Sequence, residues 1–247
     1  ICPDAISYAK SLGLDVALIT NGSLINSENS YYILKNCTWV RVSLDAGSAE
    51  VFKQTHGCGK DMFNRVLSGI SLLSKTKEKH RFSCTIGVGF LTSSTTKKDM
   101  LKFTRLCKNL NVDYVQFRPF HNDTAEIKEE LKRCRQEETN KFKVHWSINK
   151  YEYLTKKRPY GKCFGHHFAG VINVHLVVLC CHFRGMAKYE LGDLRENSLE
   201  DIWYSARRKQ VYENIDFKDC VPVCRCDAFN KVLWNLKTNT PQHVNFL

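Results

Sequence analysis

The chain has 247 residues, of which 43% are hydrophobic and 25% charged, and its formal net charge is +12. This balance excludes a disordered chain and is typical of a globular protein with a full core. The longest apolar run, residues 171–181, is far shorter than the roughly 20 residues of a membrane span. The first ten residues lack the pattern of a signal peptide. Twelve cysteines therefore predict a cytoplasmic protein with metal sites or thiols rather than disulfides.

Basic residues gather in three segments, at 75–81, 155–159 and 206–210. The plainer interpretation is that these segments are solvated helix faces. The alternative is attraction of an anionic partner such as a nucleotide, RNA or an acidic peptide. Charge alone does not choose among these partners, so it does not specifically indicate nucleic-acid binding.

The first 120 residues alternate helix-like and strand-like segments. Short, nearly continuous apolar runs are typical of buried parallel strands. In chain order we predict helices over 3–13, 27–36, 48–56, 61–77 and 96–110, and strands over 15–22, 39–46, 83–92 and 113–120. Four strands separated by helices predict an α/β protein with a parallel sheet, either doubly wound or barrel-like.

The pattern changes after Pro119. A charged helix is predicted over 125–141 and a strand-like segment over 143–154. A strand pair over 167–183 and a helix over 198–214, opened by a Ser198–Asp201 capping box, complete the series. We therefore expect a first domain over 1–120, a connecting segment over 121–160 and a small metal-bearing module over 161–247.

Small polar residues and glycine stand at the end of each predicted strand, in segments 20–22, 43–45, 87–92 and 118–119. Ligands of α/β sheets and barrels bind at the carboxyl ends of strands. Glycine lets a nucleotide-like ligand approach the backbone, and hydroxyls can meet its ribose. Any one of these segments could instead be an ordinary turn between strand and helix. Four in succession favour a ligand site.

Half of the cysteines lie after residue 160, with a spacing typical of metal ligands: Cys163, Cys180, Cys181, Cys220, Cys224 and Cys226. Thiolates from a hairpin and a distant loop can converge on one zinc ion or one iron–sulfur cluster. Adjacent Cys180 and Cys181 in a strand point to opposite faces, so we expect only one of them to ligate. The alternative is that these cysteines are buried thiols of the core. His166 and His167 are further candidate ligands.

Several segments, taken in order, carry a family resemblance: "ITNG" (19–22), "VRVSLDAGSAEVFKQTHG" (40–57), "GVGFLT" (87–92), "VQFRPF" (115–120) and "LGDLRENSLEDIWYSARRKQV" (191–211). Together with the cysteine layout they resemble radical S-adenosylmethionine (SAM) enzymes with a SPASM- or twitch-type C-terminal extension. The resemblance covers nearly the whole chain. It implies a partial (β/α)6 barrel, represented by its strands three to six, followed by a small cysteine-rich module with a β-hairpin and a helix.

The resemblance also implies a set of cofactor-binding residues, which are Thr20, Asn21, Gly22, Ser43, Asp45, Leu91, Gln116 and Arg118. Residues 20–22 would line the adenosine site, and Ser43, with Asp45 nearby, would contact the methionyl or ribose part of SAM. The strands of Leu91 and Arg118 would pass the adenine and the substrate. The resemblance assigns no catalytic residue.

In the family a hairpin glycine lies between two cysteines, five residues before the second. This spacing maps onto Cys163, His175 and Cys180. Because His175 stands where the glycine would be, Cys181 remains an alternative to Cys180. Six cysteines after residue 160 imply one auxiliary 4Fe–4S cluster, as in twitch modules, completed by Cys220 with Cys224 or Cys226.

The family's CxxxCxxC loop, which holds the SAM-binding 4Fe–4S cluster, does not occur in the sequence. We therefore expect a C-terminal fragment of a longer enzyme that does not cleave SAM by itself. The alternatives are a degenerate family member and a split enzyme completed by another chain.

For the whole enzyme the resemblance implies an oxidoreductase or modifying enzyme in which a 5′-deoxyadenosyl radical removes hydrogen from a substrate. Dehydrogenation, peptide cross-linking and epimerisation are all compatible. The expected partners are a small-molecule or peptide substrate, with an anionic group near Arg118, and an electron donor such as flavodoxin or ferredoxin. No membrane partner is expected. The alternatives are a non-enzymatic zinc or iron–sulfur module that binds RNA or an acidic peptide, and a plain α/β binding domain without metal.

Overall fold

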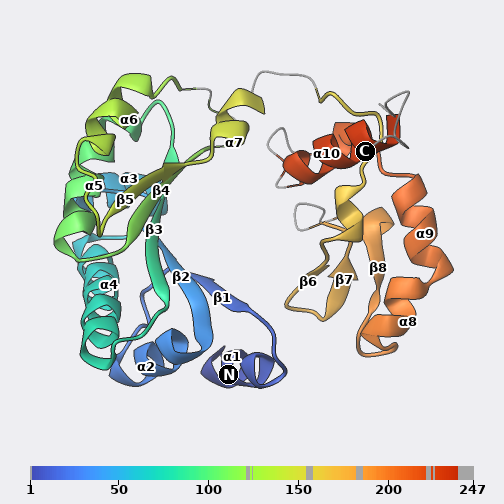
Figure 1. Ribbon diagram of the computed structural model, residues 1–247, viewed down its shortest axis with the longest axis horizontal. Coiled ribbons are helices and arrows are strands. Elements are labelled where there is room, and N and C mark those ends of the chain that lie inside the picture. Colours follow the sequence, from blue (N-terminus) through green and yellow to red (C-terminus); the bar gives the residue numbers. More distant parts are fainter. Residues whose placement is uncertain are drawn as a thin grey trace, which may run out of the picture. The chain divides into compact units, whose positions relative to one another are not determined.

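A computed structural model describes residues 2–120, 123, 125–153, 158–181, 186–220, 224 and 226–238. The chain folds into two compact units, Ile1–Tyr151 and Glu152–Leu247 (Figure 1). None of the helices in the described ranges combines the length and the apolar character needed to cross a membrane.

The first unit is built on a five-stranded sheet in the order β1-β2-β3-β4-β5, with every neighbouring pair parallel. The strands are β1 Val16–Thr20, β2 Cys37–Ser43, β3 Thr85–Thr92, β4 Tyr114–Pro119 and β5 Lys143–Trp146. The predicted α/β class is confirmed. Each of the four predicted strands is present, with ends shifted by a few residues.

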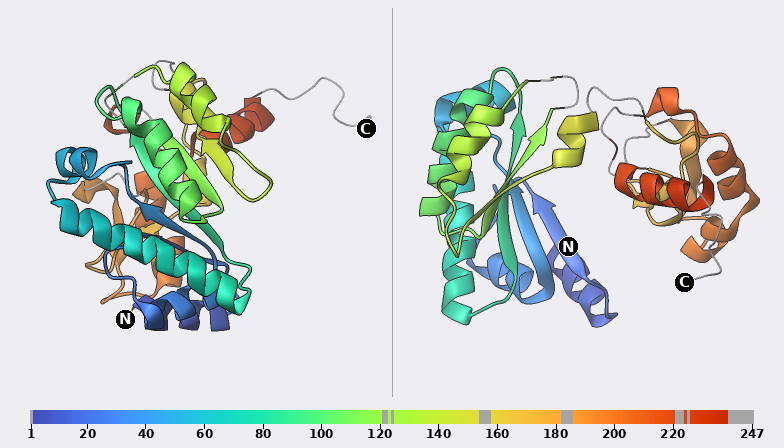
Figure 2. Two further views of the ribbon diagram at one scale, coloured as in Figure 1. Left: turned by 90° about the vertical axis from the view of Figure 1, so that its left-hand side faces the viewer. Right: turned by 45° about the horizontal axis from the view of Figure 1, so that its top comes forward.

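Seven α-helices accompany this sheet in the described ranges: α1 Cys2–Ser11, α2 Ser27–Asn36, α3 Ala49–His56, α4 Lys60–His80, α5 Met100–Asn109, α6 Lys128–Arg135 and α7 Ile148–Tyr153. Figures 1 and 2 show α4, α5 and α6 lying along one face of the sheet. The short 3₁₀-helix Lys97–Asp99 leads into α5. These three helices do not cover the other face of the strands.

The core lies between the sheet and these helices. Val42, Val88, Val115 and Val144 form a row of register partners across β2 to β5, and all are buried. Because side chains alternate along a strand, the residues between them belong to the opposite face. That second face carries Arg41, Gly87 and Tyr114 in one row, and Ser43, Gly89, Gln116 and His145 in the next.

The fifth strand was not expected as part of the sheet. We predicted α6 and β5 within a connecting segment, but both pack on the first unit. β5 has only four residues, in which buried Val144 alternates with exposed Lys143 and His145. Such a short, half-polar strand is typical of a sheet edge, and its sequence lacks the continuous apolar run that marked the inner strands.

The second unit contains a three-stranded antiparallel sheet in the order β6-β7-β8, formed by β6 Val171–Ile172, β7 Val177–Leu179 and β8 Glu190–Asp193. Its α-helices are α8 Leu199–Tyr204, α9 Ala206–Glu213 and α10 Asp227–Thr238, and its 3₁₀-helices are Gly165–His167, Ala187–Tyr189 and Phe217–Asp219. A separate small core includes Val178, Cys180, Tyr189 and Ile202.

The helix predicted over 198–214 is two helices. Ser205 has an extended backbone, with ψ at 153°, and its hydroxyl accepts from the backbone N–H of Arg208. It therefore ends α8 and caps α9. Ser198 caps α8 as expected, because its hydroxyl accepts from the N–H of Asp201.

Candidate functional site

The turn after β1 holds the first three predicted cofactor residues. Thr20 shares the helix-covered face with its register partner Val42, and its hydroxyl accepts from the N–H of Gly22. Gly22 has a φ of +75°, and a Cβ there would lie 2.7 Å from Cγ1 of Val42. Asn21 accepts from the N–H of Ser23. These contacts shape the turn at the strand end. The Thr20 and Asn21 side chains accept hydrogen bonds from the backbone of that turn.

Asp45 links two strand ends. Its φ is +54°, which is uncommon for a non-glycine residue. Oδ1 accepts from the N–H of Leu91 at 2.7 Å, and Oδ2 lies 3.7 Å from Nε2 of His56. Burial raises the pKa of the Asp45 carboxyl, although the Leu91 N–H and His56 oppose this. The structure thus brings together two predicted cofactor residues, Asp45 and Leu91, and adds His56.

Gln116 and Arg118 lie on the open face of β4 with Arg41 of β2 beside them. The Arg41 guanidinium donates to the Gln116 side-chain oxygen. A Cβ on Gly89 would lie 3.6 Å from Cδ of Arg41 and 3.8 Å from Nη2 of Arg118. Both arginine side chains therefore extend over Gly89, at the level of its register partner Ser43. Sequence reasoning missed Arg41, although a charge inside the apolar run "WVRVS" was a usable signal.

The second unit gathers the predicted cysteines. One small cavity is lined by all six of them, Cys163, Cys180, Cys181, Cys220, Cys224 and Cys226, together with His166. They come from three segments: the loop before β6, the end of β7, and the segment between α9 and α10. No three His, Cys, Asp or Glu side chains of the described ranges converge closely enough to hold a single metal ion. The thiols surround a common space instead.

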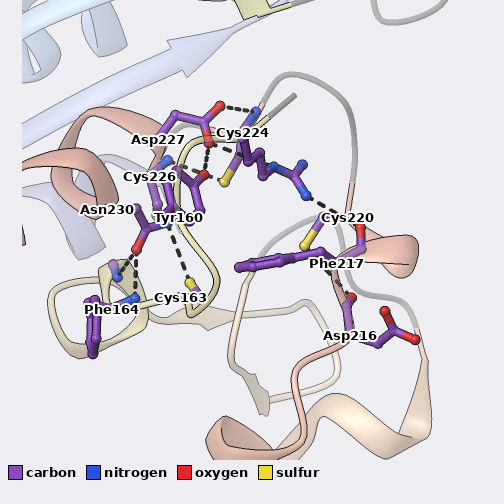
Figure 3. A network of polar contacts seen from close by, with 12 residues as sticks. Tyr160, Cys163, Phe164, Asp216, Phe217, Cys220, Cys224, Cys226, Asp227 and Asn230 are labelled. Atoms are coloured by element: carbon purple, nitrogen blue, oxygen red, sulfur yellow. Dashed lines mark hydrogen bonds and ion pairs between the residues drawn. The ribbon is translucent and has the colours of Figure 1, made fainter. Parts of the chain in front are cut away.

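Two polar residues of α10 join the cysteine segments (Figure 3). The Asn230 oxygen accepts from the N–H groups of Phe164 and Gly165 at 2.6 and 2.7 Å, and its amide nitrogen donates to Sγ of Cys163 at 3.6 Å. Asn230 is buried. One side chain thus fixes the backbone and the sulfur of the first cysteine loop.

Asp227 holds the backbone of the last cysteine segment. It accepts from the Tyr160 hydroxyl and from the N–H of Cys224 at 3.3 Å, and Nε of Arg158 lies 3.8 Å from its Oδ1 (Figure 3). Burial, together with the hydrogen bond to the Asp227 carboxylate, raises the pKa of Tyr160. The carboxylate is buried, and its partners satisfy it.

The donor set and its packing fit an iron–sulfur cluster. Gly165 lets the segments approach, because a Cβ there would lie 2.5 Å from Cβ of Cys226. The backbone N–H of Cys226 donates to Sγ of Cys224, the kind of contact that tunes a cluster thiolate. Burial raises the pKa of Cys163, whereas the Asn230 N–H lowers it. Because a ligating cysteine must be deprotonated, the N–H donors favour the ligating form.

His166 lies in this cavity and not in solvent. It is 4% exposed, and its ring stacks on Tyr212 with centroids 3.6 Å apart. Its Nδ1 is buried and has no hydrogen-bond partner. The His167 ring lies beside it, with the two ring centroids 3.9 Å apart and the planes tilted by 49°, but His167 does not line the cavity.

Asp227 and Asn230 were also missed by sequence reasoning. Both follow Cys226 closely, on the first turn of a helix that begins at Asp227. Polar residues at positions one and four after a candidate ligand share a helix face, and this was the available signal.

Known proteins resemble the chain in two ways. Residues 171–227 match SPASM, an iron–sulfur cluster-binding domain. The "uncharacterized protein MJ0804" of Methanocaldococcus jannaschii is 42% identical over 76 residues, which are 29% of this chain and 24% of that protein. The SPASM match supports the iron–sulfur cofactor that the resemblance implied.

Two solved structures share the fold. SuiB of Streptococcus suis bound to S-adenosylmethionine is 14% identical, with a TM-score of 0.61, over 85% of this chain and 53% of SuiB. Native anSMEcpe with bound AdoMet is 15% identical, with a TM-score of 0.53, over 85% of this chain and 65% of that protein. The chain thus spans less than two thirds of these relatives. It shares its fold with these two structures, and its residues 171–227 are similar to the SPASM iron–sulfur cluster-binding domain.

Proposed function

We propose that this chain is part of a radical SAM enzyme and that its second unit binds an auxiliary 4Fe–4S cluster. One observation carries the proposal: six cysteines from three separate segments line a single cavity, within and beside the SPASM match. Cys163 and one of the adjacent pair Cys180 and Cys181 would hold the cluster from the hairpin side. Cys220 with Cys224 or Cys226 would hold it from the segment before α10, as in a twitch module.

The first unit would bind SAM at the carboxyl ends of its strands. Asp45, held against the N–H of Leu91, orients that end of β3. Ser43 at the end of β2 is the candidate for a hydroxyl contact to SAM, and the turn at 20–22 would border the adenosine. When bound, a reduced 4Fe–4S cluster and SAM supply a 5′-deoxyadenosyl radical that removes a hydrogen atom from a substrate. The residues of this chain would orient SAM and the substrate and exclude water from them.

The proposed substrate is a peptide. Two of the structural relatives are described with peptides bound, SuiB with precursor peptide SuiA and anSMEcpe with Kp18Cys peptide. The proposed reaction is dehydrogenation, cross-linking or epimerisation of that peptide. An electron donor such as flavodoxin or ferredoxin would serve the enzyme in the cytoplasm, and the net charge of +12 suits an acidic donor.

The test is the anaerobic iron and sulfide content of the 247-residue chain after reconstitution. About four irons with matching sulfide are expected for one cluster. Cys163→Ser should lower this content, whereas Cys58→Ser, in the first unit and outside the cavity, should leave it unchanged. One zinc without sulfide would contradict the proposal and favour the non-enzymatic module.

A further inference from the structure

Arg41 is a buried cation on the face of the sheet that α4, α5 and α6 do not cover. It lies in the middle of β2, between the core residues Val40 and Val42, and is only 8% exposed. Its register neighbours on β3 and β4 are Gly87 and Tyr114. Glycines inside a strand mark places where something approaches the backbone closely. Here the Tyr114 ring covers Gly87, and the Arg41 side chain passes over Gly89.

Arg118 brings a second cation to the same place. It follows Gln116 by two residues on β4, and its Nη2 lies near Gly89 on the same side as Arg41. The Nε atoms of both arginines are buried and have no hydrogen-bond partner. Two guanidinium groups therefore converge with unused donors.

In the described part of the chain, neither Arg41 nor Arg118 forms an ion pair with a carboxylate. The Arg41 contacts are the Gln116 oxygen, the Tyr114 hydroxyl and the Trp39 ring, none of which carries a full charge at neutral pH. Burial, followed by repulsion from Arg118, lowers the pKa of Arg41. Attraction to the Asp45 carboxylate opposes this shift, but that carboxylate is already engaged by the Leu91 N–H and by His56.

Other cations of this unit are treated differently. Lys77 pairs with Asp113 at 2.6 Å, and Arg105 and Lys108 both pair with Glu137. Those cations are all more exposed than Arg41. Burying a charge without an ion-pair partner is costly, so two such cations side by side point to an anionic ligand that would pair with them.

We propose that Arg41 and Arg118 form a subsite for an anionic group of the substrate, either a carboxylate or a phosphate. Paired guanidinium groups with free N–H donors match the planar or tetrahedral oxygens of such groups. Arg41 precedes Ser43 by two residues, which is roughly 7 Å along the strand. The subsite therefore lies closer to the middle of β2 than the strand end that is assigned to SAM. That the anionic group belongs to the substrate rests on the proposed function, whereas the existence of the anion site does not.

The test is thermal unfolding and calorimetric binding of the 247-residue chain with inorganic phosphate or glutarate as the probe, against sodium chloride of equal ionic strength. The wild-type chain should bind at least one probe and gain thermal stability. Arg41→Gln and Arg118→Gln should each weaken binding about tenfold or more, because a charge-assisted pair is lost. Arg65→Gln, an exposed arginine of α4, should bind as the wild type does.

Without any probe, Arg41→Gln should be at least as stable as the wild type, since it removes a buried charge beside another. Failure of the wild type to bind either probe, or unchanged binding by both variants, would overturn the proposal. Destabilised Arg41→Gln with probe binding intact would assign Arg41 a purely structural role. The stronger probe identifies the group as phosphate or carboxylate. The binding assay needs neither cluster nor SAM. A negative binding result would therefore not affect the proposed cluster, and a negative iron and sulfide result would not affect the anion subsite.

Discussion

Asn230 of α10 donates a hydrogen bond to Sγ of Cys163, 67 residues earlier in the chain, at 3.6 Å. The same side chain accepts from two consecutive backbone N–H groups beside that cysteine. Helix α10 therefore positions the first candidate ligand directly. The cysteine cavity depends on a residue that is not itself a ligand.

Replacing Asn230 should separate folding from cluster binding. Asn230→Ala leaves the N–H groups of Phe164 and Gly165 without their acceptor, and about 2–4 kcal/mol should be lost from the free energy of unfolding. Asn230→Asp keeps the acceptor but puts a carboxylate beside Cys163, so it should lose less stability yet retain less iron. Urea unfolding and iron content measure the two effects.

Asn214→Ala, at an exposed position after α9, is the control and should change the free energy of unfolding by less than about 0.5 kcal/mol. If Asn230→Ala were as mild as this control, the network around Cys163 would have no structural weight.

Glu137 should make stability depend on pH. Its carboxylate accepts from Nε of Arg105 at 2.7 Å and from Nζ of Lys108 at 3.1 Å, and these bonds, Arg105 first, lower its pKa. The folded pKa lies below the unfolded one, so the stabilisation is present above the ordinary glutamate value, about 4.3, and disappears as the pH falls below it.

Glu137→Gln should therefore cost about 0.5–1 kcal/mol at neutral pH and close to nothing in acid. Urea unfolding across the pH range checks this. Glu129→Gln, an exposed position on α6, serves as the control and should give a small difference from the wild type. A loss for Glu137→Gln that is the same at every pH would show that these ion pairs do not stabilise the fold.

The sequence predicted β1 to β4 because buried parallel strands are nearly continuous apolar runs, a local signal. It did not assign β5 to the sheet, since pairing with β4 is a long-range event and four residues with one buried side chain carry little pattern. It also joined α8 and α9, because one serine is tolerated inside a helix and Ser205 alone did not mark the boundary, although serine is favoured at caps.

The candidate site also contains residues that the sequence predicted and residues that only the structure revealed. Six cysteines were predicted as candidate ligands from residue type and spacing, and the structure brings all of them to one cavity. Which four of them ligate stays a prediction. Arg41, Asp227 and Asn230 acquire their roles only through contacts with residues distant in sequence, so composition and spacing did not reveal them.

The turn between β6 and β7 holds Leu176 at a φ of +62°, which strains a branched side chain. Leu176→Gly should relieve this strain, and after the entropic cost of glycine a gain of about 0.5–1 kcal/mol should remain. Val174→Gly in the same turn, a residue 92% exposed and without positive φ, should be neutral or destabilising. Thermal unfolding compares them, and equal effects of the two substitutions would contradict the assignment of strain.

Leu176 also bears on the choice between Cys180 and Cys181. The family spacing places a glycine five residues before the second cysteine, and glycine is the residue that suits a left-handed backbone. The left-handed residue of this hairpin is Leu176 and not His175. Counting five residues from Leu176 leads to Cys181, which is half-buried, whereas Cys180 is 1% exposed and packs with Val178 in the core.

Cys181→Ser should therefore lower the iron and sulfide content per chain while the free energy of unfolding without cluster changes little. Cys180→Ser should do the opposite, because a hydroxyl replaces a buried thiol in the small core. Anaerobic reconstitution followed by iron analysis, with urea unfolding of the cluster-free chains, separates the two. Loss of iron in Cys180→Ser with iron retained in Cys181→Ser would return the ligand to Cys180, and would mean that the left-handed turn does not set the register of the cluster.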